Sequence, residues 1–186
     1  MKNAGRVALS VLGGGRIETQ PPRNAITKLY MKETPPVSIV LEKLSIPHRV
    51  FRHANPVTSL EQAARERGQR PGQVVRSILF RIAEDEFVMV LVAGPTQVSW
   101  KALRKVLGRS RISMATEDEV LSVTGYRIGT VGPFGTSHQL KVLIEAGVLS
   151  EEEISIGSGM RNTAVMLRSA DLRRGLQNAE VVSLIE

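Results

Sequence analysis

The most strand-like segment of this sequence reads Val74-Val75-Arg76-Ser77-Ile78-Leu79-Phe80. It continues to residue 82, and a second apolar run occupies residues 86–93, after the polar pair Glu84-Asp85. Apolar and β-branched runs on either side of a short polar turn are typical of a β-hairpin. The sequence therefore predicts two paired strands over residues 74–93.

One charged residue, Arg76, stands inside the first of these strands. Alternation along a strand places its side chain on the same face as Val74, Ile78 and Phe80. That face should be largely buried, and a charge there faces either solvent or a polar cleft. The strand pattern alone leaves both options open, so Arg76 is a candidate site residue.

Helices and strands alternate along the rest of the chain. Thr58 and Thr116 each begin an [S/T]-x-x-E pattern, which is a capping box, and Ser99 is a third N-cap. This alternation predicts one α/β (α+β) domain with a mixed sheet. Beyond the hairpin, we expect helices at 37–44, 58–68, 99–107, 116–123 and 169–175, and strands at 48–52, 140–144, 154–156, 164–167 and 181–185.

Length and composition exclude several classes of protein. The 186 residues suit one domain, and the lack of cysteine excludes disulfides, thiolate metal sites and a cysteine nucleophile. Three histidines are scattered along the chain, so no metal site is expected; His48 and His53 flank a predicted strand and are read as surface or packing residues. No apolar run approaches the ~18 residues of a membrane span. The net charge of +7 permits a nucleic-acid partner without requiring one.

The first thirty residues differ from the rest. They hold five basic residues, one acidic residue, a Gly13-Gly14-Gly15 run and a Pro21-Pro22 pair, with little periodicity. We therefore expect an N-terminal tail over residues 1–33 and a folded domain over residues 34–186. An alternative is that translation starts at Met31, which mass spectrometry of the native N-terminus would show.

Two glycine-bearing turns are candidate binding elements. The first, residues 125–135, reads Gly-Tyr-Arg-Ile-Gly-Thr-Val-Gly-Pro-Phe-Gly, and the second is Gly157-Ser158-Gly159. Glycine lets a backbone approach a ligand closely, and amides in such turns can line an anion or carbonyl site. Spacing alone equally permits two tight connections with no ligand. His138 lies beside the first turn and is the one histidine considered as a site residue.

Basic residues gather around the helix expected at 99–107. No acidic residue occurs from Phe87 to Thr116, and a helix with Leu103 buried would turn its basic side chains outward. Such a surface can hold phosphates, although a solvated helix face is the alternative. Aromatic residues make up only 4% of the chain, so contacts with nucleic acid would rest on charge and shape. This basic ridge comprises Lys101, Arg104, Lys105, Arg109 and Arg111.

Three of these segments together resemble the YbaK-type aminoacyl-tRNA deacylases, relatives of the editing domain inserted in bacterial prolyl-tRNA synthetases. The segment 74–80 is similar to the family's V-x-K-[T/S]-L-[L/I] strand, and 124–135 to its T-G-Y-…-G-x-x-x-P-[F/L]-G loop. Residues 154–159, with 164–167 and Asp171-Leu172, resemble its closing strand–turn–strand–helix segment. The similarity runs from about residue 37 to residue 185.

This resemblance implies a mixed, curved sheet flanked by helices, with a cleft at the glycine loop. It implies hydrolysis of the ester that joins a wrong amino acid to tRNA, typically Cys or Ala on tRNA(Pro) or another small amino acid, with no metal or other cofactor. In the family the loop backbone holds the terminal adenosine and the ester, and a water or a substrate group attacks. The implied catalytic set is Arg76, Gly129, Thr130, Val131, Gly132 and Pro133; the substrate-binding set is Gly157, Ser158, Gly159, Arg161 and His138.

The sequence departs from the family pattern at three positions. The family lysine is Arg76, which keeps the charge but offers a planar fork in place of a point charge. The turn often written S-G-G is Gly157-Ser158-Gly159, and a position that is often acidic is Ala164. Arg161 and Asn162 lie between these positions, where they could supply the missing polar contacts.

The first hypothesis is a freestanding cytoplasmic aminoacyl-tRNA deacylase that clears mischarged tRNA. Its partner is the acceptor end of tRNA, held by the basic ridge, with a synthetase as a second possible partner and no membrane association. One alternative, favoured by Arg76 and Ala164, is a catalytically silent module that binds tRNA or a synthetase. Another is a hydrolase of other small acyl esters.

Overall fold

The computed structural model describes residues 34–185, so the predictions made for residues 1–33 lie outside the described part of the chain. Every helix and strand expected within residues 34–185 is present, with one added strand, β4, and two short 3₁₀ turns, Pro71–Gln73 and Ala146–Leu149. The helices are α2 (Pro36–Lys43), α3 (Leu60–Glu66), α4 (Trp100–Leu107), α5 (Glu117–Thr124) and α6 (Ser169–Gly175). The strands are β1 (Arg49–Arg52), β2 (Val75–Ala83), β3 (Glu86–Ala93), β4 (Ser113–Met114), β5 (Lys141–Glu145), β6 (Glu153–Gly157), β7 (Thr163–Arg168) and β8 (Glu180–Val182).

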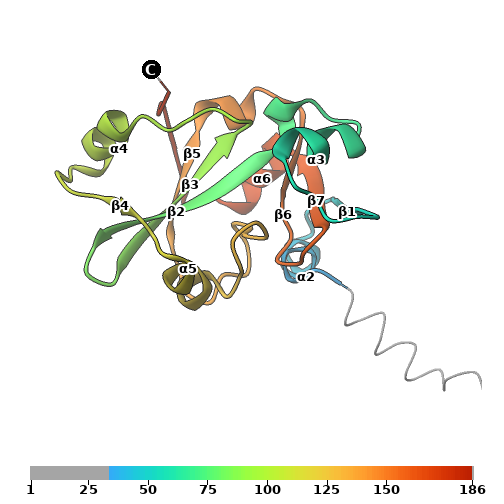
Figure 1. The fold of residues 1–186 in the computed structure, drawn as a ribbon, viewed down its shortest axis with the longest axis horizontal. Helices are drawn as coiled ribbons and strands as arrows, with labels where there is room; N and C mark the ends of the chain where they lie inside the picture. The colour runs from blue at the N-terminus through green and yellow to red at the C-terminus, as the bar shows by residue number, and fades with distance from the viewer. Residues whose placement is uncertain (1–33, 186) are drawn as a thin grey trace, which may run out of the picture. The chain divides into compact units, whose positions relative to one another are not determined.

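The strands form two sheets (Figure 1). The larger sheet has the order β4-β2-β3-β5-β8, with antiparallel pairs at β4-β2-β3 and parallel pairs at β3-β5-β8. The smaller sheet is the antiparallel β1-β7-β6. A single parallel bridge between Val74 and Ser155 joins them. The predicted α/β class with a mixed sheet is confirmed, and the strands are divided between two sheets.

The predicted hairpin is the β2–β3 pair. Asp85 turns the chain with a φ of 53°, a left-handed conformation that aspartate tolerates better than most residues. From Val88 to Val92, β3 is fully buried. A strand covered on both faces reads as an unbroken apolar run, which is how residues 86–93 appear in the sequence.

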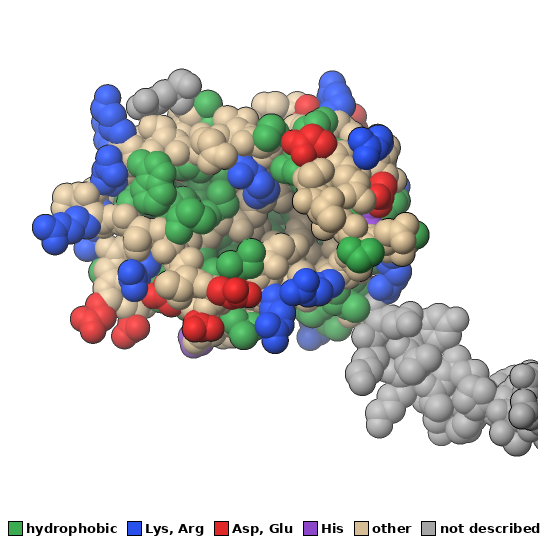
Figure 2. All heavy atoms as spheres, in the orientation of Figure 1, with side chains coloured by type: hydrophobic (Ala, Val, Ile, Leu, Met, Phe, Trp, Pro, Cys, Tyr) green, Lys and Arg blue, Asp and Glu red, His purple; other side chains and the backbone are tan. Residues whose placement is uncertain are grey.

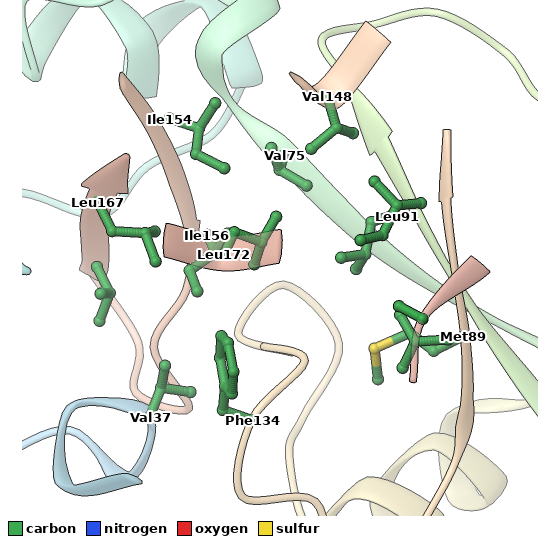
Figure 3. Packing of buried hydrophobic residues seen from close by; sticks show 14 of the residues in the cluster. Val37, Val75, Met89, Leu91, Phe134, Val148, Ile154, Ile156, Leu167 and Leu172 are labelled. Carbon is green, nitrogen blue, oxygen red and sulfur yellow. The ribbon is translucent and has the colours of Figure 1, made fainter. Parts of the chain in front are cut away.

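Two apolar clusters cover the two faces of this hairpin. Under α4, Leu103 packs on Phe80, Val88 and Val90. On the opposite face, side chains from β2 and β3 meet those of β6, β7, α2, α6 and the glycine loop (Figure 3). The second cluster joins the two sheets in one core, and each large side chain buried there contributes roughly 1.5–3 kcal/mol.

The helix caps agree with the sequence except at α3. Ser99 and Thr116 accept hydrogen bonds at the starts of α4 and α5, and Thr116 completes the predicted capping box. At α3 the cap is Ser59, whose hydroxyl accepts from the Gln62 amide at 3.0 Å, and the prediction of Thr58 was wrong. The Thr58 hydroxyl instead donates to the Gln62 side chain, which competes with the predicted box.

One edge of β2 is only partly covered. β4 pairs with β2 at Phe80 and Arg81, and the amide of Ala115 donates to the Leu79 carbonyl. Within residues 34–185, no strand pairs with the part of β2 before Leu79 on this side. This open edge faces the smaller sheet across a cavity.

Candidate functional site

The cavity beside the open edge of β2 has a volume of about 630 Å³ and is called the cleft below. Its walls come from β2, from the ends of β6 and β7, from α3 with the loop before it, from residues 114–115 and from the glycine loop at 128–131. Figure 2 shows a hollow in the middle of the viewed face, with basic side chains on its rim. A concave space of this size between elements is the usual form of a small-ligand site.

Arg76 lines the cleft. The strand pattern allowed its side chain to face either solvent or a polar cleft, and the structure shows the second arrangement. Its Nη2 group donates to the carbonyl of Thr96. Its Nε atom is buried and has no hydrogen-bond partner among residues 34–185. Partial burial lowers the pKa of the guanidinium from its ordinary value. A buried N–H without an acceptor costs about 1–3 kcal/mol, so this atom favours an acceptor in the cleft.

The predicted catalytic loop is divided by the structure. Gly129, Thr130 and Val131 line the cleft, whereas Gly132 and Pro133 do not. A Cβ on Gly132 would lie 2.3 Å from the Gly157 carbonyl oxygen, so Gly132 is a packing position. Pro133 lines a separate cavity of about 210 Å³.

The second glycine turn packs against this loop, backbone on backbone. A Cβ on Gly157 would lie 2.1 Å from the carbonyl oxygen of Val131, and the amide of Gly159 donates to the Thr130 carbonyl at 2.8 Å. Ser158 is buried, and its hydroxyl donates to the Thr163 carbonyl at 2.9 Å, inside the turn and outside the cleft. Of the three turn residues, only Gly157 lines the cleft.

Charge in the cleft is one-sided. The cleft is also lined by Arg161, Asn162 and Ala164. Ala164 occupies the position where the family often has an acidic residue, so the cleft has a methyl group there in place of a carboxylate. The charged lining residues are Arg67, Arg76 and Arg161, and no acidic side chain of residues 34–185 joins them. An excess of cations around a cavity attracts anionic or strongly polar groups.

The remaining predicted site residues lie elsewhere. His138 is exposed outside the cleft, with its Nδ1 atom 3.3 Å from the Val123 carbonyl oxygen. None of the basic ridge lines the cleft. Arg109 pairs with Glu86 at 2.8 Å, which uses one ridge cation within the protein. Lys101, Arg104 and Lys105 lie on α4, over the Phe80 face of the larger sheet.

A hydrogen-bonded chain at the α3 end of the cleft was missed by sequence reasoning. His53, expected as a surface or packing residue, is buried, and its Nδ1 atom lies 2.5 Å from the Glu66 carboxylate. The Nε of Arg67 lies 3.1 Å from Nε2 of the same ring, and the Arg67 Nη1 donates to the Ser155 hydroxyl at 2.8 Å. Burial lowers the pKa of Arg67 to about 10, and the hydrogen bond from His53 holds the pKa of Glu66 below its ordinary value.

A helical spacing in the sequence marks Arg67. It is the C-cap residue of α3 and follows the buried Ala63 and Ala64 by four and three residues, which places it below the inward face of the helix. His53 has no comparable signal, because it lies just after β1 and its contact with Glu66 and Arg67 depends on how α3 packs.

Metal and membrane features can be stated for the described part of the chain. Within residues 34–185, no group of three or more His, Asp or Glu side chains is placed to hold a metal ion. In the same residues, no helix combines the length and the hydropathy needed to cross a bilayer.

Comparison with known proteins relates this fold and cleft to one family. The model of the aminoacyl-tRNA editing domain matches residues 54–174. Protein YwhH of Bacillus subtilis is 30% identical over 114 residues, which cover 61% of this chain and 72% of YwhH. The proline–tRNA ligase of Thermosipho melanesiensis is 28% identical over 137 residues, 74% of this chain but only 24% of the ligase.

A solved structure shares the architecture. The crystal structure of a proposed trans-editing enzyme for prolyl-tRNA synthetase superposes with a TM-score of 0.74 at 25% sequence identity. The superposition covers 81% of this chain and 95% of that protein. The family match includes Arg76, the glycine loop and the β6–β7 turn, which form three walls of the cleft. This protein therefore belongs to the aminoacyl-tRNA editing domain family.

Proposed function

We propose that this protein hydrolyses the ester bond between an amino acid and the 3′ end of a mischarged tRNA. It acts in trans, as a freestanding cytoplasmic deacylase, and its substrates are tRNA(Pro) carrying Cys or Ala, or a tRNA carrying another small amino acid. The observation that carries the proposal is the convergence of Arg76, Gly129–Val131 and Gly157 on one cleft. A small amino-acid pocket discriminates poorly by binding alone, and a separate hydrolytic site corrects the resulting errors.

The glycine loop would polarise the ester. The Thr130 amide donates to the Arg127 carbonyl at 3.0 Å, while the amides of Gly129 and Val131 donate to no backbone carbonyl within residues 34–185. Backbone N–H groups without a partner at a cleft wall can stabilise the oxyanion that forms when the ester is attacked. Rate enhancement then rests on positioning and polarisation of a substrate that is already activated.

Side chains around the cleft favour attack by water or by a group of the substrate. The Thr130 hydroxyl donates to the Arg127 carbonyl at 2.8 Å, so its proton is engaged. The Nε2 atom of His53 faces the Arg67 guanidinium and cannot serve as a free base. A protein nucleophile needs such a base within hydrogen-bond reach. We therefore propose catalysis without a covalent intermediate. The proposal that no metal is needed rests on the family resemblance.

Arg76 would bind the terminal nucleotide. Its unpaired Nε atom and its remaining donors can engage a phosphate or ribose oxygen through two parallel N–H groups. The lysine of the family pattern would meet such an oxygen as a single point charge. We infer that the arginine preserves the contact while making it more directional.

A second candidate is a module that binds tRNA, or a synthetase, without turnover. The cleft lacks any carboxylate among the described residues, and Arg76 and Ala164, two of the three departures from the family pattern, both line it. This candidate predicts salt-sensitive binding of tRNA with no release of amino acid.

A deacylation screen distinguishes the two candidates. Purified protein is incubated with tRNA(Pro) charged with Ala, Cys or Pro and with Ser- and Thr-charged tRNAs, each with and without a chelator. Hydrolysis of a mischarged tRNA, unchanged by the chelator, supports editing without a metal. Binding of tRNA at low salt without hydrolysis of any substrate supports the silent module. Turnover of small acyl esters alone, with no use of tRNA, would contradict both.

A further inference from the structure

The guanidinium of Arg67 is held rigidly at the α3 end of the cleft. It donates to His53, which follows β1, and to Ser155 on β6. Figure 1 shows where α3, β1 and β6 lie in the fold. Both partner side chains come from elements of the smaller sheet or its edge, so three separate segments fix its position. A side chain with this many fixed contacts loses little further entropy when it binds a ligand.

The hydrogen-bond directions define the state of His53. The Arg67 Nε atom can only donate, so Nε2 of His53 is the acceptor and carries no proton. The ring proton is then on Nδ1, which donates to the Glu66 carboxylate. Glu66 and Arg67 are the charged groups that face this ring from α3, and the Phe51 ring packs on it from β1. A neutral imidazole thus orients the cation and leaves its charge intact.

Arg67 keeps donors for a ligand. Of its five N–H groups, one faces His53 and one faces Ser155. The Nη2 group makes no hydrogen bond with any residue from 34 to 185, and Arg67 lines the cleft. Glu66 is its sequence neighbour but binds His53, and no carboxylate faces Arg67 from within the cleft. Glu66 attracts the Arg67 charge but forms no direct ion pair with it. A half-buried cation without a direct ion pair favours binding of an anion beside it.

We propose that Arg67 forms an anion-binding subsite in the cleft, separate from Arg76 and positioned by His53. The ligand is an oxyanion carried by the 3′ end of an aminoacyl-tRNA, either a phosphate of the terminal nucleotides or the carboxylate of a small acidic aminoacyl group, aspartyl. This assignment rests on the proposed function for the identity of the molecule that carries the anion. The two sources share one chemistry, an anionic group with two oxygens that can accept from the remaining N–H groups of one guanidinium.

The test compares anionic and neutral small ligands by calorimetry. One pair is 5′-AMP and adenosine; the other is adenosine joined to aspartate or to asparagine through a non-hydrolysable 3′ amide. Wild-type protein should bind the anionic member of at least one pair about tenfold more tightly, which corresponds to ~1.4 kcal/mol. The Arg67→Gln variant should lose that preference. The matched control is Arg65→Gln, which removes the charge of an exposed arginine on α3. This variant should keep the preference for the anionic ligand.

The outcomes are separable. Loss confined to the AMP pair assigns the subsite to phosphate, and loss confined to the aspartyl pair assigns it to a side-chain carboxylate. An equal preference in Arg67→Gln and wild type would overturn the proposal. If Arg67→Gln fails to fold, the ¹⁵N shifts of the Arg67 guanidinium in wild-type protein provide the same test, because they should move with the anionic ligands and stay fixed with the neutral ones.

His53 is a positioning residue in this proposal. His53→Phe removes the acceptor for Arg67 and should lower the affinity for the anionic ligands several-fold more than it lowers the affinity for adenosine. His53→Gln restores an acceptor oxygen and should recover part of the preference for the anionic ligand. Equal losses of adenosine and AMP binding would instead indicate a general structural role. None of these assays requires turnover, so a protein that binds anions through Arg67 but hydrolyses no aminoacyl-tRNA would contradict the deacylase function alone.

Discussion

Two buried polar atoms distinguish the cleft at the residue scale. The Nε of Arg76 and the hydroxyl of Ser77 are neighbours on β2, and neither has a hydrogen-bond partner within residues 34–185. Buried polar groups are normally paired, and exceptions gather where a ligand completes the set. The sequence marked Arg76 because a charge interrupts an apolar run, but it did not mark Ser77, since a serine inside a strand is unremarkable without knowledge of the open edge.

Replacement of Arg76 by alanine should lower kcat/KM for deacylation at least tenfold, or about 1.4 kcal/mol of transition-state stabilisation. The cause is loss of the cationic contact with the terminal nucleotide. Single-turnover deacylation assays measure this loss of rate. Arg81→Ala removes an arginine from the same strand outside the cleft and should leave the rate unchanged. Unchanged turnover in Arg76→Ala would remove Arg76 from the site.

Gly157→Ala should destabilise the protein by about 1–3 kcal/mol, because its Cβ would lie 2.1 Å from the Val131 carbonyl oxygen. Gly72→Ala is the control, since its Cβ would meet only a glutamate side-chain oxygen at 3.7 Å. Urea unfolding of the two variants and the wild type checks the difference. Equal midpoints for all three would show that the two turns do not pack as described.

At the scale of the element, the helices and the hairpin were predictable and the sheet partition was not. Capping residues and apolar periodicity are local signals, and they placed α2, α4, α5 and α6 within about one residue of their observed bounds. The division into two sheets depends on which strand edges meet, and a single bridge between Val74 and Ser155 connects them. The two-residue β4 was missed because it is too short to show alternation.

The cap of α3 provides a test at this scale. Ser59→Ala should cost about 1 kcal/mol, because the Gln62 amide loses its acceptor. Thr58→Ala removes only an exposed side-chain bond and should cost less. Chemical denaturation of both variants measures the two effects. The reverse order would restore Thr58 as the cap.

The Glu66–His53 contact should contribute to stability in a pH-dependent way. The folded-state pKa of Glu66 lies below its ordinary value of 4.5, mainly because of the hydrogen bond with His53. A lowered carboxyl pKa stabilises the fold fully above the unfolded-state value, and this stabilisation is lost as the pH falls through the folded-state pKa. Unfolding measured from pH 6 to pH 3 should show a smaller acid loss for Glu66→Gln than for wild type. Identical pH profiles would contradict the contact.

On the scale of the whole molecule, the cleft lies where the two sheets and the glycine loop meet, and no single segment predicts it. The resemblance of three segments to an editing family predicted a cleft at the glycine loop, and Gly129–Val131, Gly157 and Arg161 do line one with Arg76. The cleft is not lined by Gly132, Pro133, Ser158 or His138. Residues that are adjacent in sequence can lie on opposite sides of a turn, so a contiguous motif includes residues that face away from the cleft. Arg67 and His53 were missed because they are brought together only by packing of α3.

Binding of tRNA by the basic ridge is testable by salt dependence. If the ridge holds the acceptor stem, replacing Lys101, Arg104 and Lys105 with Gln should reduce the slope of log K against log salt by up to about 2–3. Arg109→Gln should have a smaller effect, because Arg109 is paired with Glu86. Filter binding at several salt concentrations gives both slopes. An unchanged slope in the triple variant would place the stem on another surface.

The close packing of the two glycine turns links their possible sequences. The Gly157 Cα faces the Val131 carbonyl, and the Gly132 Cα faces the Gly157 carbonyl, so neither backbone has room to receive a side chain from the other. A change at either glycine requires a compensating displacement of the opposite turn. If the cleft holds the aminoacyl group as proposed, evolution of a new amino-acid preference would proceed through paired substitutions in both turns, or through residues such as Arg161 that border the cleft without this constraint.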